Sequence, residues 1–365
     1  MRNKSPLAEA DPWNRLEQNM VSTADGTLRH PLQADSGLDS YSSTLRGCTA
    51  DGTPDLWSIN TPTLPLGQQS WEYHHTCACL LAMGDAEEIY PLARDKAEST
   101  RLNNQHKLVL DASGGAIDPS IPLNTVSAVA DVATGTGVWL YDARKQINET
   151  PGTGTQIYYH GFDISAAQFP ENPDEIEFSV HDILKPFPAE HHNRYDLVNV
   201  KFLVAAFPES QYPAAVNNLL TILKPGGYLQ WIEFDFSAVV DPNGPARNPR
   251  SDYVTEPWVK FLEHNNLSLS APEALETVFK DVGLAKVKHR SALVRGRDHL
   301  KPQAREWLLT FFTDMMPLLL LKSGIAASQE QAESEATRRL GELAAYLAEG
   351  EIMDVRFGTV VGQKL

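Results

Sequence analysis

Short apolar segments alternate with helical segments through the middle of the chain, beginning near residue 125. Apolar residues recur at every third or fourth position over 137–147 and 213–223, which predicts helices there. Short apolar runs bounded by glycine, proline or acidic residues predict strands between them. Strands that alternate with helices are typical of a mostly parallel sheet covered on both faces. The predicted strands span 125–133, 157–163, 177–182, 195–202 and 228–236.

The chain after residue 240 is mainly helical in its apolar periodicity. The segment 285–294 is predicted as a sixth strand, and we expect the segment after residue 350 to pair antiparallel at the sheet edge. The predicted fold is therefore α/β, with a mostly parallel seven-stranded sheet, an antiparallel last strand, and helical additions at the N-terminal and C-terminal sides. The predicted helices lie around 252–266, 272–282, 301–322 and 328–349.

Three parts of the chain differ in composition. Residues 1–70 are rich in Ser, Asp, Gly, Thr and Pro and are interpreted as a polar N-terminal arm. Residues 71–124 are interpreted as a helical lid segment, and residues 125–365 as the main domain. A helical insertion around 240–350 is expected to form a substrate pocket. The most apolar run, 307–321, is shorter than the roughly 20 residues that a bilayer span needs. It is interpreted as a buried or partner-facing helix, which leaves a homodimer possible.

The charge of the chain disfavours some classes of partner. The 31 basic and 47 acidic side chains give 31 − 47 = −16, and there is no basic block. Such a chain repels phosphate backbones and anionic lipid surfaces, so we expect no nucleic-acid and no membrane partner. The three cysteines, Cys48, Cys77 and Cys79, match neither a disulfide framework nor a zinc site. We expect a soluble, cytoplasmic protein.

A glycine-rich turn follows the first predicted strand, from Asp131 to Gly137, with the sequence DVATGTG. Glycines at a strand-to-helix turn allow a ligand to approach the backbone closely. A dinucleotide site carries a third glycine three residues after the second, and Leu140 occupies that position. The Asp131 carboxylate would repel a pyrophosphate and would suit a ligand with a cationic amino group. The turn therefore favours S-adenosylmethionine (SAM) over NAD, and an NAD-dependent oxidoreductase is the weaker alternative.

Two further acidic residues stand where later strands end. Asp163 ends the second predicted strand, where an acid can accept hydrogen bonds from both ribose hydroxyls. Asp182 ends the third, where it can accept the adenine amino group while Ile183 packs on the ring. The alternatives are a helix N-cap for Asp163 and a surface acid for Asp182. The turn Pro225-Gly226-Gly227 leads into the fifth predicted strand and binds nothing itself.

These motifs resemble those of fungal class I SAM-dependent methyltransferases of secondary metabolism, the LaeA/UMTA-like group, over roughly residues 85 to 290. The resemblance rests on DVATGTGVWLYD, GFDISAAQFP, FSVHDILKPFP and LLTILKPGGYLQWIEFD. Ala133 departs from the wider class, which mostly carries its first glycine there. The resemblance implies a Rossmann-like methyltransferase fold, with Asn199 and Lys201 near the sulfonium and Tyr90 closing over the cofactor. The cofactor-binding residues that follow are Tyr90, Asp131, Thr134, Gly135, Thr136, Gly137, Asp163, Ile164, Asp182, Ile183, Asn199 and Lys201.

The predicted reaction is an in-line methyl transfer from SAM to a small-molecule secondary metabolite of polyketide, terpenoid or alkaloid type. His106 and Glu233 are the candidate general bases, each with a structural role as the alternative. No histidine and carboxylate group has metal-ligand spacing, so the enzyme is expected to be metal-independent. The second hypothesis is a SAM-binding protein that does not transfer methyl, either a cyclisation catalyst or a regulatory partner. The acceptor pocket is predicted to be lined by Trp258, Phe261, Trp307, Phe311, Phe312, Met315 and Met316. The alternative is that these residues form ordinary apolar core or a dimer interface.

Overall fold

The computed structural model describes residues 94–153, 156–237, 248–353 and 355–365. Four short strands precede this part and form two antiparallel pairs, β1 with β2 and β3 with β4. Tyr90, most of the predicted polar arm and the first part of the predicted lid segment lie outside the described residues. The helices and the large sheet all belong to the unit Ala82–Leu365. The short strands are β1 (Val21–Ser22), β2 (Leu28–Arg29), β3 (Gly47–Cys48) and β4 (Pro54–Asp55).

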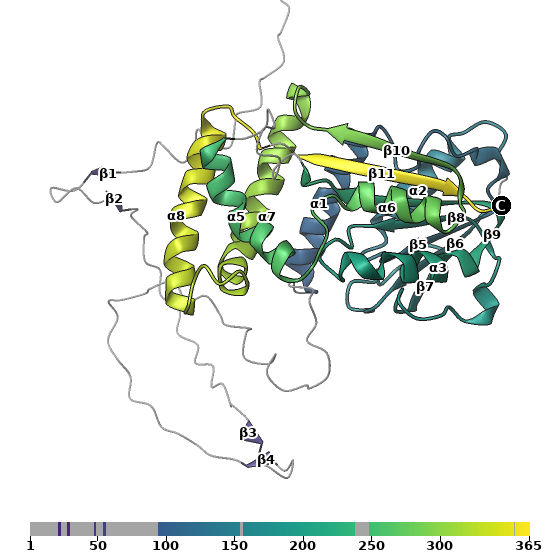
Figure 1. Cartoon of the computed structure of the whole chain (residues 1–365), viewed down its shortest axis with the longest axis horizontal. Coiled ribbons are helices and arrows are strands. Elements are labelled where there is room, and N and C mark those ends of the chain that lie inside the picture. Colours follow the sequence, from purple (N-terminus) through teal and green to yellow (C-terminus); the bar gives the residue numbers. More distant parts are fainter. Residues whose placement is uncertain are drawn as a thin grey trace, which may run out of the picture. The chain divides into compact units, whose positions relative to one another are not determined.

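Seven strands form one sheet in the order β10–β11–β9–β8–β5–β6–β7 (Figure 1). The last five strands in this order are parallel, and β11 is antiparallel to both of its neighbours. The predicted α/β fold is confirmed. The strands are β5 (Ala128–Val132), β6 (Tyr158–Asp163), β7 (Glu177–Val180), β8 (Tyr195–Lys201), β9 (Leu223–Phe234), β10 (Ala285–Leu293) and β11 (Arg356–Gln363).

Two expectations about the sheet are wrong. The last strand of the chain, β11, lies between β9 and β10 rather than at the edge, because its buried middle is covered by helices and both of its edges are paired. The turn Pro225-Gly226-Gly227 falls inside the span of β9 instead of before it. There the pairing of β8 with β9 shifts register, from Tyr195 opposite Leu223 to Leu197 opposite Tyr228. An irregularity of this kind keeps the strand continuous while the backbone bends.

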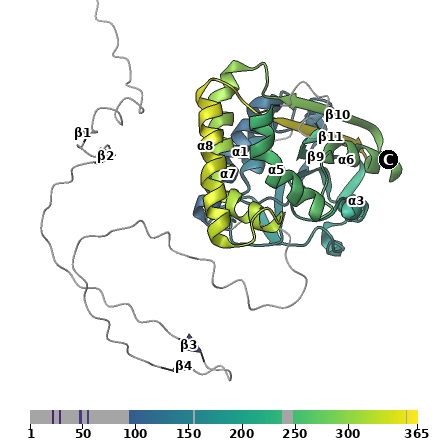
Figure 2. The same cartoon turned by 60° about the vertical axis from the view of Figure 1, so that its left-hand side comes forward.

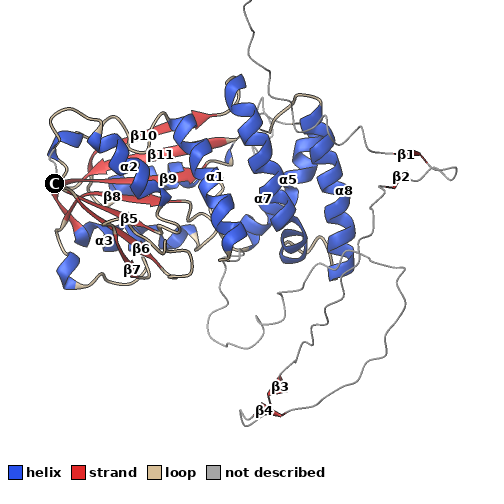
Figure 3. Ribbon diagram, turned by 180° about the vertical axis from the view of Figure 1, so that it is seen from behind, coloured by secondary structure: helices blue, strands red, loops and turns tan. Residues whose placement is uncertain are grey.

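Helices cover both faces of the sheet, as Figures 1 and 3 show from opposite sides. Helices α3 (Tyr212–Ile222) and α6 (Ala271–Asp281) pack on one face. Helix α2 (Val138–Asn148) packs on β5 and β6 from the other face, and α1 (Lys96–Ser113) contacts both α2 and β10. A buried apolar cluster fills the space between sheet and helices on each face. The sheet is therefore a buried scaffold whose strand ends are available for a site.

Helices α5 (Pro249–His264), α7 (Lys301–Lys322) and α8 (Gln329–Ala348) pack on one another beside the sheet (Figure 2). The apolar run predicted as a buried or partner-facing helix is the core of α7, where Phe312, Met316 and Leu320 are buried. Arg339 of α8 is also buried and forms ion pairs with Glu335 and with Glu256 of α5. None of the helices in the described part of the chain has the length and apolar character of a membrane span.

Candidate functional site

A cavity of about 420 Å³ opens at the carboxyl ends of the parallel strands. In an open α/β sheet this edge is where ligands bind. We call it the strand-end cavity. Loops that follow β5, β6, β7 and β8 build most of its wall, and α1 adds the rest. Its lining includes Arg94, Leu102, Gln105, Ala133, Thr134, Gly135, Thr136, Asp163, Ile164, Gln168, Asp182, Ile183, Lys201 and Phe202.

The predicted cofactor-binding residues divide into two groups in the structure. Eight of them line the strand-end cavity, and Asp131, Gly137 and Asn199 do not. Tyr90 lies outside the described residues. Direct contact of Asp131, Gly137 and Asn199 with a ligand stays a prediction. In the structure these three residues contact the turn and the sheet. The eight that line the cavity are Thr134, Gly135, Thr136, Asp163, Ile164, Asp182, Ile183 and Lys201.

Asp131 lies beneath the turn and holds it in place. Its side chain is buried, and its two carboxylate oxygens accept hydrogen bonds from Thr134 Oγ1 and Asn199 Nδ2, each at 2.7 Å. Burial raises the pKa of Asp131 to about 6, while the nearby Lys201 ammonium and these two hydrogen bonds act against that rise. From the sequence, this carboxylate is predicted to face the cationic amino group of a ligand. In the structure the cation whose charge acts on it is Lys201.

The two glycines of the turn have different surroundings. Both have positive φ angles, 53° at Gly135 and 74° at Gly137. A Cβ atom at Gly135 would meet only Leu102, at 3.5 Å, which is an ordinary contact. A Cβ atom at Gly137 would lie 2.7 Å from Cζ of Phe178, on β7. Gly137 therefore allows the start of α2 to pack against β7, whereas Gly135 lies at the cavity wall.

Asp163 and Asp182 present carboxylates to the strand-end cavity. Asp163 accepts the N–H groups of Gly135 at 2.8 Å and Ser165 at 3.1 Å. Burial raises its pKa, with these backbone hydrogen bonds opposing the rise. Asp182 accepts the N–H of Leu184 through Oδ1, and its Oδ2 has no hydrogen bond from the described residues. Ile164 is an apolar side chain that is 58% exposed beside them.

Lys201 brings a buried cation to the same cavity from the end of β8. Its ammonium donates to Nδ1 of His106 at 3.0 Å, and Nε2 of His106 lies 2.9 Å from Oδ2 of Asp142. Since the Asp142 carboxylate accepts a hydrogen, Nε2 carries the proton and Nδ1 is the acceptor. Burial and the Lys201 charge lower the pKa of His106 to about 2, so the ring is neutral. Burial lowers the pKa of Lys201 to about 8, with Asp131 and Asp142 opposing.

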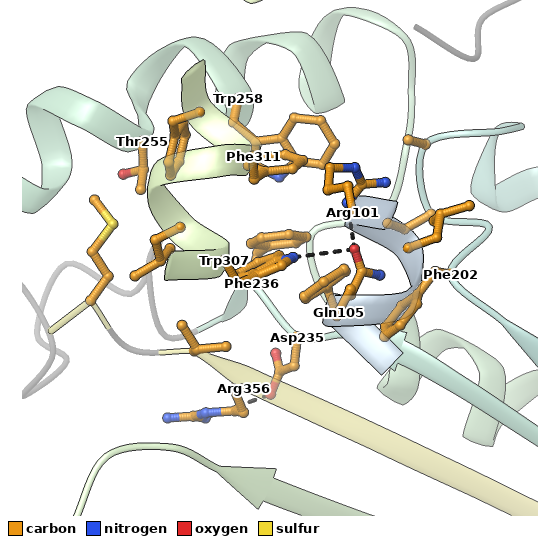
Figure 4. Close-up of a pocket in the computed structure, with 18 residues that line it drawn as sticks. Arg101, Gln105, Phe202, Asp235, Phe236, Thr255, Trp258, Trp307, Phe311 and Arg356 are labelled. Atoms are coloured by element: carbon orange, nitrogen blue, oxygen red, sulfur yellow. Dashed lines mark hydrogen bonds and ion pairs between the residues drawn. The ribbon is translucent and has the colours of Figure 1, made fainter. Parts of the chain in front are cut away.

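A second, smaller cavity of about 100 Å³ adjoins the first, and we call it the aromatic cavity (Figure 4). Leu102, Gln105 and Phe202 line both cavities, so the two share a wall. Four of the predicted pocket residues line it, namely Trp258, Trp307, Phe311 and Phe312. Phe261, Met315 and Met316 do not line it. They are buried in the apolar core, which was the alternative to a place in the pocket. The remaining aromatic lining residues are Phe202, Phe234 and Phe236.

Neither candidate general base reaches a cavity. His106 is 1% exposed and both ring nitrogens are engaged by Lys201 and Asp142. Glu233 is fully buried, and its Oε1 accepts the N–H of Leu203 and Nε1–H of Trp231. Burial raises the pKa of Glu233 to about 7. A general base must come within hydrogen-bond reach of the proton it removes. The structure instead gives His106 a contact with Lys201 and Glu233 a contact with the loop after β8.

Sequence reasoning missed several residues that line the site. Arg94, Leu102 and Gln105 come from the start of the described chain and from α1, and Gln168 comes from the loop after β6. A signal for α1 was present, because Glu98, Arg101 and Gln105 recur at spacings of three and four and so share one helix face. No strand-end motif includes them, so only the packing of α1 against the sheet and α7 shows their role.

The residues of the strand-end cavity fit SAM. Two carboxylates suit a ribose and an adenine amino group, apolar side chains such as Ile183 suit the adenine ring, and Arg94 and Lys201 suit a carboxylate. Ala133, Gly135 and Gly137 of the turn all have positive φ angles, and the N–H of Gly135 donates to Asp163, which ties the turn to the carboxylate at the cavity wall. Asp163 and Asp182 also line the cavity, and their carboxylates would repel a phosphate.

The fold and this set of donors and acceptors define a class I SAM-dependent methyltransferase. The sequence pattern of a family described as a methyltransferase domain matches residues 129–227. The methyltransferase grgD of a Penicillium species is 31% identical over 254 residues, which covers 67% of this chain and 87% of that protein. The chain belongs to the fungal class I methyltransferases of secondary metabolism, and SAM is its cofactor.

Two other relatives cover different shares of the chain. The N-methyltransferase sirN of Leptosphaeria maculans is 34% identical over 149 residues, covering 40% of this chain and half of that protein. The secondary metabolism regulator laeA of Aspergillus fumigatus is 23% identical over 308 residues, which covers 79% of this chain and 76% of that protein. One of these relatives is named as an N-methyltransferase and the other as a regulator, so membership of the family does not specify the acceptor.

Proposed function

We propose that this enzyme transfers the methyl group of SAM to a small secondary metabolite whose aromatic or otherwise apolar body binds in the aromatic cavity. The wall that the two cavities share supports this most directly. Leu102, Gln105 and Phe202 contact both spaces, so a cofactor on one side and an acceptor on the other meet at these residues. Holding the two reactants in this relation is the main contribution that a protein makes to such a displacement.

The residues of the strand-end cavity bind and orient the cofactor in this proposal. Asp163 accepts the ribose hydroxyls, and Asp182 accepts the adenine amino group through its Oδ2. Lys201, held by His106 and Asp142, faces the carboxylate of the methionine part together with Arg94. When bound, SAM supplies a methyl group on a sulfonium, which is already a good leaving group. The proposal therefore assigns no metal ion to the transfer.

The aromatic cavity would bind the acceptor by apolar contact and stacking. Its lining rings, which include Trp258, Trp307 and Phe311, exclude water and favour a flat ligand. Arg101 is paired with Glu98 and Asp235 with Arg356, so the charged groups at its wall balance. A neutral polyketide, terpenoid or alkaloid fits this surface better than a highly charged molecule. No His or Glu side chain of the described residues lines this space, whereas the Asp235 carboxylate does. A proton released by the acceptor therefore passes to water or to Asp235.

Transfer of a labelled methyl group tests the proposal. The purified enzyme and SAM with a trideuterated methyl group are incubated with an extract of fungal metabolites, and products are identified by mass spectrometry. We expect one or a few apolar metabolites to gain the deuterated methyl, and the Trp258→Ala variant to lose this product. If S-adenosylhomocysteine binds the enzyme but no extract fraction gains the label, the chain is instead a SAM-binding protein that does not transfer methyl.

A further inference from the structure

Gln105 stands at the wall between the two cavities, on the face of α1 that packs toward α7. Its side chain is 3% exposed, so its amide is removed from bulk water. Arg101 Nη1 donates to its Oε1 at 2.6 Å, and Trp307 Nε1 donates to the same oxygen at 3.2 Å. Both partners are pure donors, which fixes the assignment of oxygen and nitrogen in this amide.

The amide nitrogen of Gln105 is left without a partner in the part of the chain that the structure describes. Figure 4 shows the amide oxygen turned toward Arg101 and Trp307 and the nitrogen turned to the side of Phe202. An N–H group that is shielded from bulk water and makes no hydrogen bond costs free energy, so an unpartnered donor at a cavity wall points to a ligand that accepts from it.

The rest of the aromatic cavity supports a ligand that supplies an acceptor. Nε1 of Trp258 is a second buried donor with no hydrogen bond among the described residues. The polar oxygens of the wall have partners within the protein, because Asp235 accepts from Ser237 and pairs with Arg356, and the Thr255 hydroxyl donates to the Ser251 carbonyl. Among the described residues, Nε2 of Gln105 and Nε1 of Trp258 are N–H donors of the lining residues that lack an acceptor.

Arg101 keeps the Gln105 amide in this orientation. Its guanidinium forms two hydrogen bonds with the Glu98 carboxylate, at 2.6 and 2.7 Å, and both residues are buried. The Arg101 guanidinium therefore cannot rotate without breaking its bidentate ion pair with Glu98. The same pairing balances the Arg101 charge, so the Gln105 donor is best matched by a neutral oxygen rather than a carboxylate.

We infer that Gln105 determines specificity for the acceptor, by donating a hydrogen bond from Nε2 to a carbonyl oxygen of a ketone or amide carried on an aromatic ring. This rests on the proposed function, in which the acceptor occupies the aromatic cavity. The hydrogen bond places the carbonyl at the shared wall, beside the strand-end cavity, while the ring lies among Trp258, Trp307 and Phe311. Gln105 is a positioning residue that orients the acceptor toward the cofactor.

The variant Gln105→Glu isolates the donor. It keeps an oxygen for Arg101 and Trp307 at the same chain length and replaces the amide NH₂ donor with an acceptor oxygen that carries negative charge. Gln331→Glu is the matched control, because Gln331 is an exposed residue of α8 and its oxygen, which accepts the N–H of Ala327, is retained. The probes are acetophenone and ethylbenzene, which have similar size and differ in the carbonyl. Their dissociation constants are measured by saturation-transfer NMR in the presence of saturating S-adenosylhomocysteine.

We expect the unsubstituted enzyme and Gln331→Glu to bind acetophenone about fivefold more tightly than ethylbenzene, the size of a net hydrogen bond. In Gln105→Glu this preference should disappear or reverse, while ethylbenzene and S-adenosylhomocysteine bind as before. The inference is overturned if Gln105→Glu keeps the acetophenone preference, or if it weakens S-adenosylhomocysteine and ethylbenzene equally. If neither probe binds the unsubstituted enzyme, the aromatic cavity is not the acceptor site, and the proposed function fails with it.

Discussion

Gly137 and Gly135 offer the sharpest test of how the turn after β5 works. An alanine at Gly137 would have to adopt a φ of 74°, which costs a residue with a Cβ about 1–2 kcal/mol. Its Cβ would also lie 2.7 and 2.9 Å from two ring atoms of Phe178, and overpacking of this kind costs about 1–3 kcal/mol. We therefore expect Gly137→Ala to lower the free energy of unfolding by about 2–5 kcal/mol.

Gly135→Ala provides the matched comparison. It carries the same backbone cost, about 1–2 kcal/mol, but its Cβ meets only Leu102 at an ordinary distance. Because Gly135 lines the strand-end cavity and Gly137 does not, Gly135→Ala should weaken S-adenosylhomocysteine at least tenfold. The folded Gly137→Ala variant should bind S-adenosylhomocysteine with an affinity within about threefold of that of the unsubstituted enzyme. The two variants differ because the new methyl group meets the ligand at position 135 and meets protein at position 137.

The assays are urea denaturation followed by tryptophan fluorescence, and calorimetric titration with S-adenosylhomocysteine at a temperature where all variants are folded. The double variant Gly137→Ala/Phe178→Leu should recover the steric part of the loss, about 1–2 kcal/mol, as a coupling energy. A Gly137→Ala variant of normal stability but poor ligand affinity would show that both glycines serve ligand approach, as the sequence alone suggested.

Three further predictions concern buried charged groups. The pKa of Glu233 is raised by burial from 4.5 to about 7, so its contribution to stability is complete below about pH 4.5 and is lost as the pH rises through 7. Glu233→Gln should therefore be more stable than the unsubstituted enzyme at pH 8, by up to about 3 kcal/mol, and equal at pH 4.5, in urea titrations at both values. The pKa of Lys201 is lowered to about 8, so its ammonium is lost as the pH rises past 8. Measured by calorimetry, S-adenosylhomocysteine should bind the unsubstituted enzyme more weakly at pH 9 than at pH 7. The Lys201→Met variant should bind it weakly at both pH values, and any pH dependence of affinity that remains in this variant comes from titration of the ligand. Arg339→Leu should lower the free energy of unfolding by about 2–4 kcal/mol, since it removes both ion pairs of a buried guanidinium; a loss below 1 kcal/mol in thermal unfolding would show that these pairs are incidental.

Much of the fold was predictable because the period of the apolar positions directly reflects burial. The parallel strands and the helices after residue 240 appear within a few residues of their predicted bounds, with α7 at 301–322 as expected. The position of β11 inside the sheet was not predictable. An edge strand and a central antiparallel strand of this length can have the same apolar pattern, so the two are distinguished only by knowing which strands pair with each edge.

The site was predictable where a residue ends a strand and not where it lies on a helix or beneath the surface. Asp163 and Asp182 follow apolar runs, and the strand-end rule alone brings both to the cavity. Asp131 follows the same rule and yet lies below the wall, because Thr134 and Asn199 occupy its oxygens. Gln105 has no local signal of this kind, since its role depends on Trp307, which is 202 positions away in the chain.

One calorimetric experiment tests most directly the central claim that the cofactor occupies the strand-end cavity and not the adjoining aromatic cavity. S-Adenosylhomocysteine is titrated into the unsubstituted enzyme and into the Asp163→Ala and Trp258→Ala variants under one condition. The account predicts tight binding to the first, at least a tenfold loss in Asp163→Ala from a missing charge-assisted contact, and unchanged affinity in Trp258→Ala. Equal losses in the two variants, or no loss in Asp163→Ala, would contradict the assignment of the strand-end cavity to the cofactor.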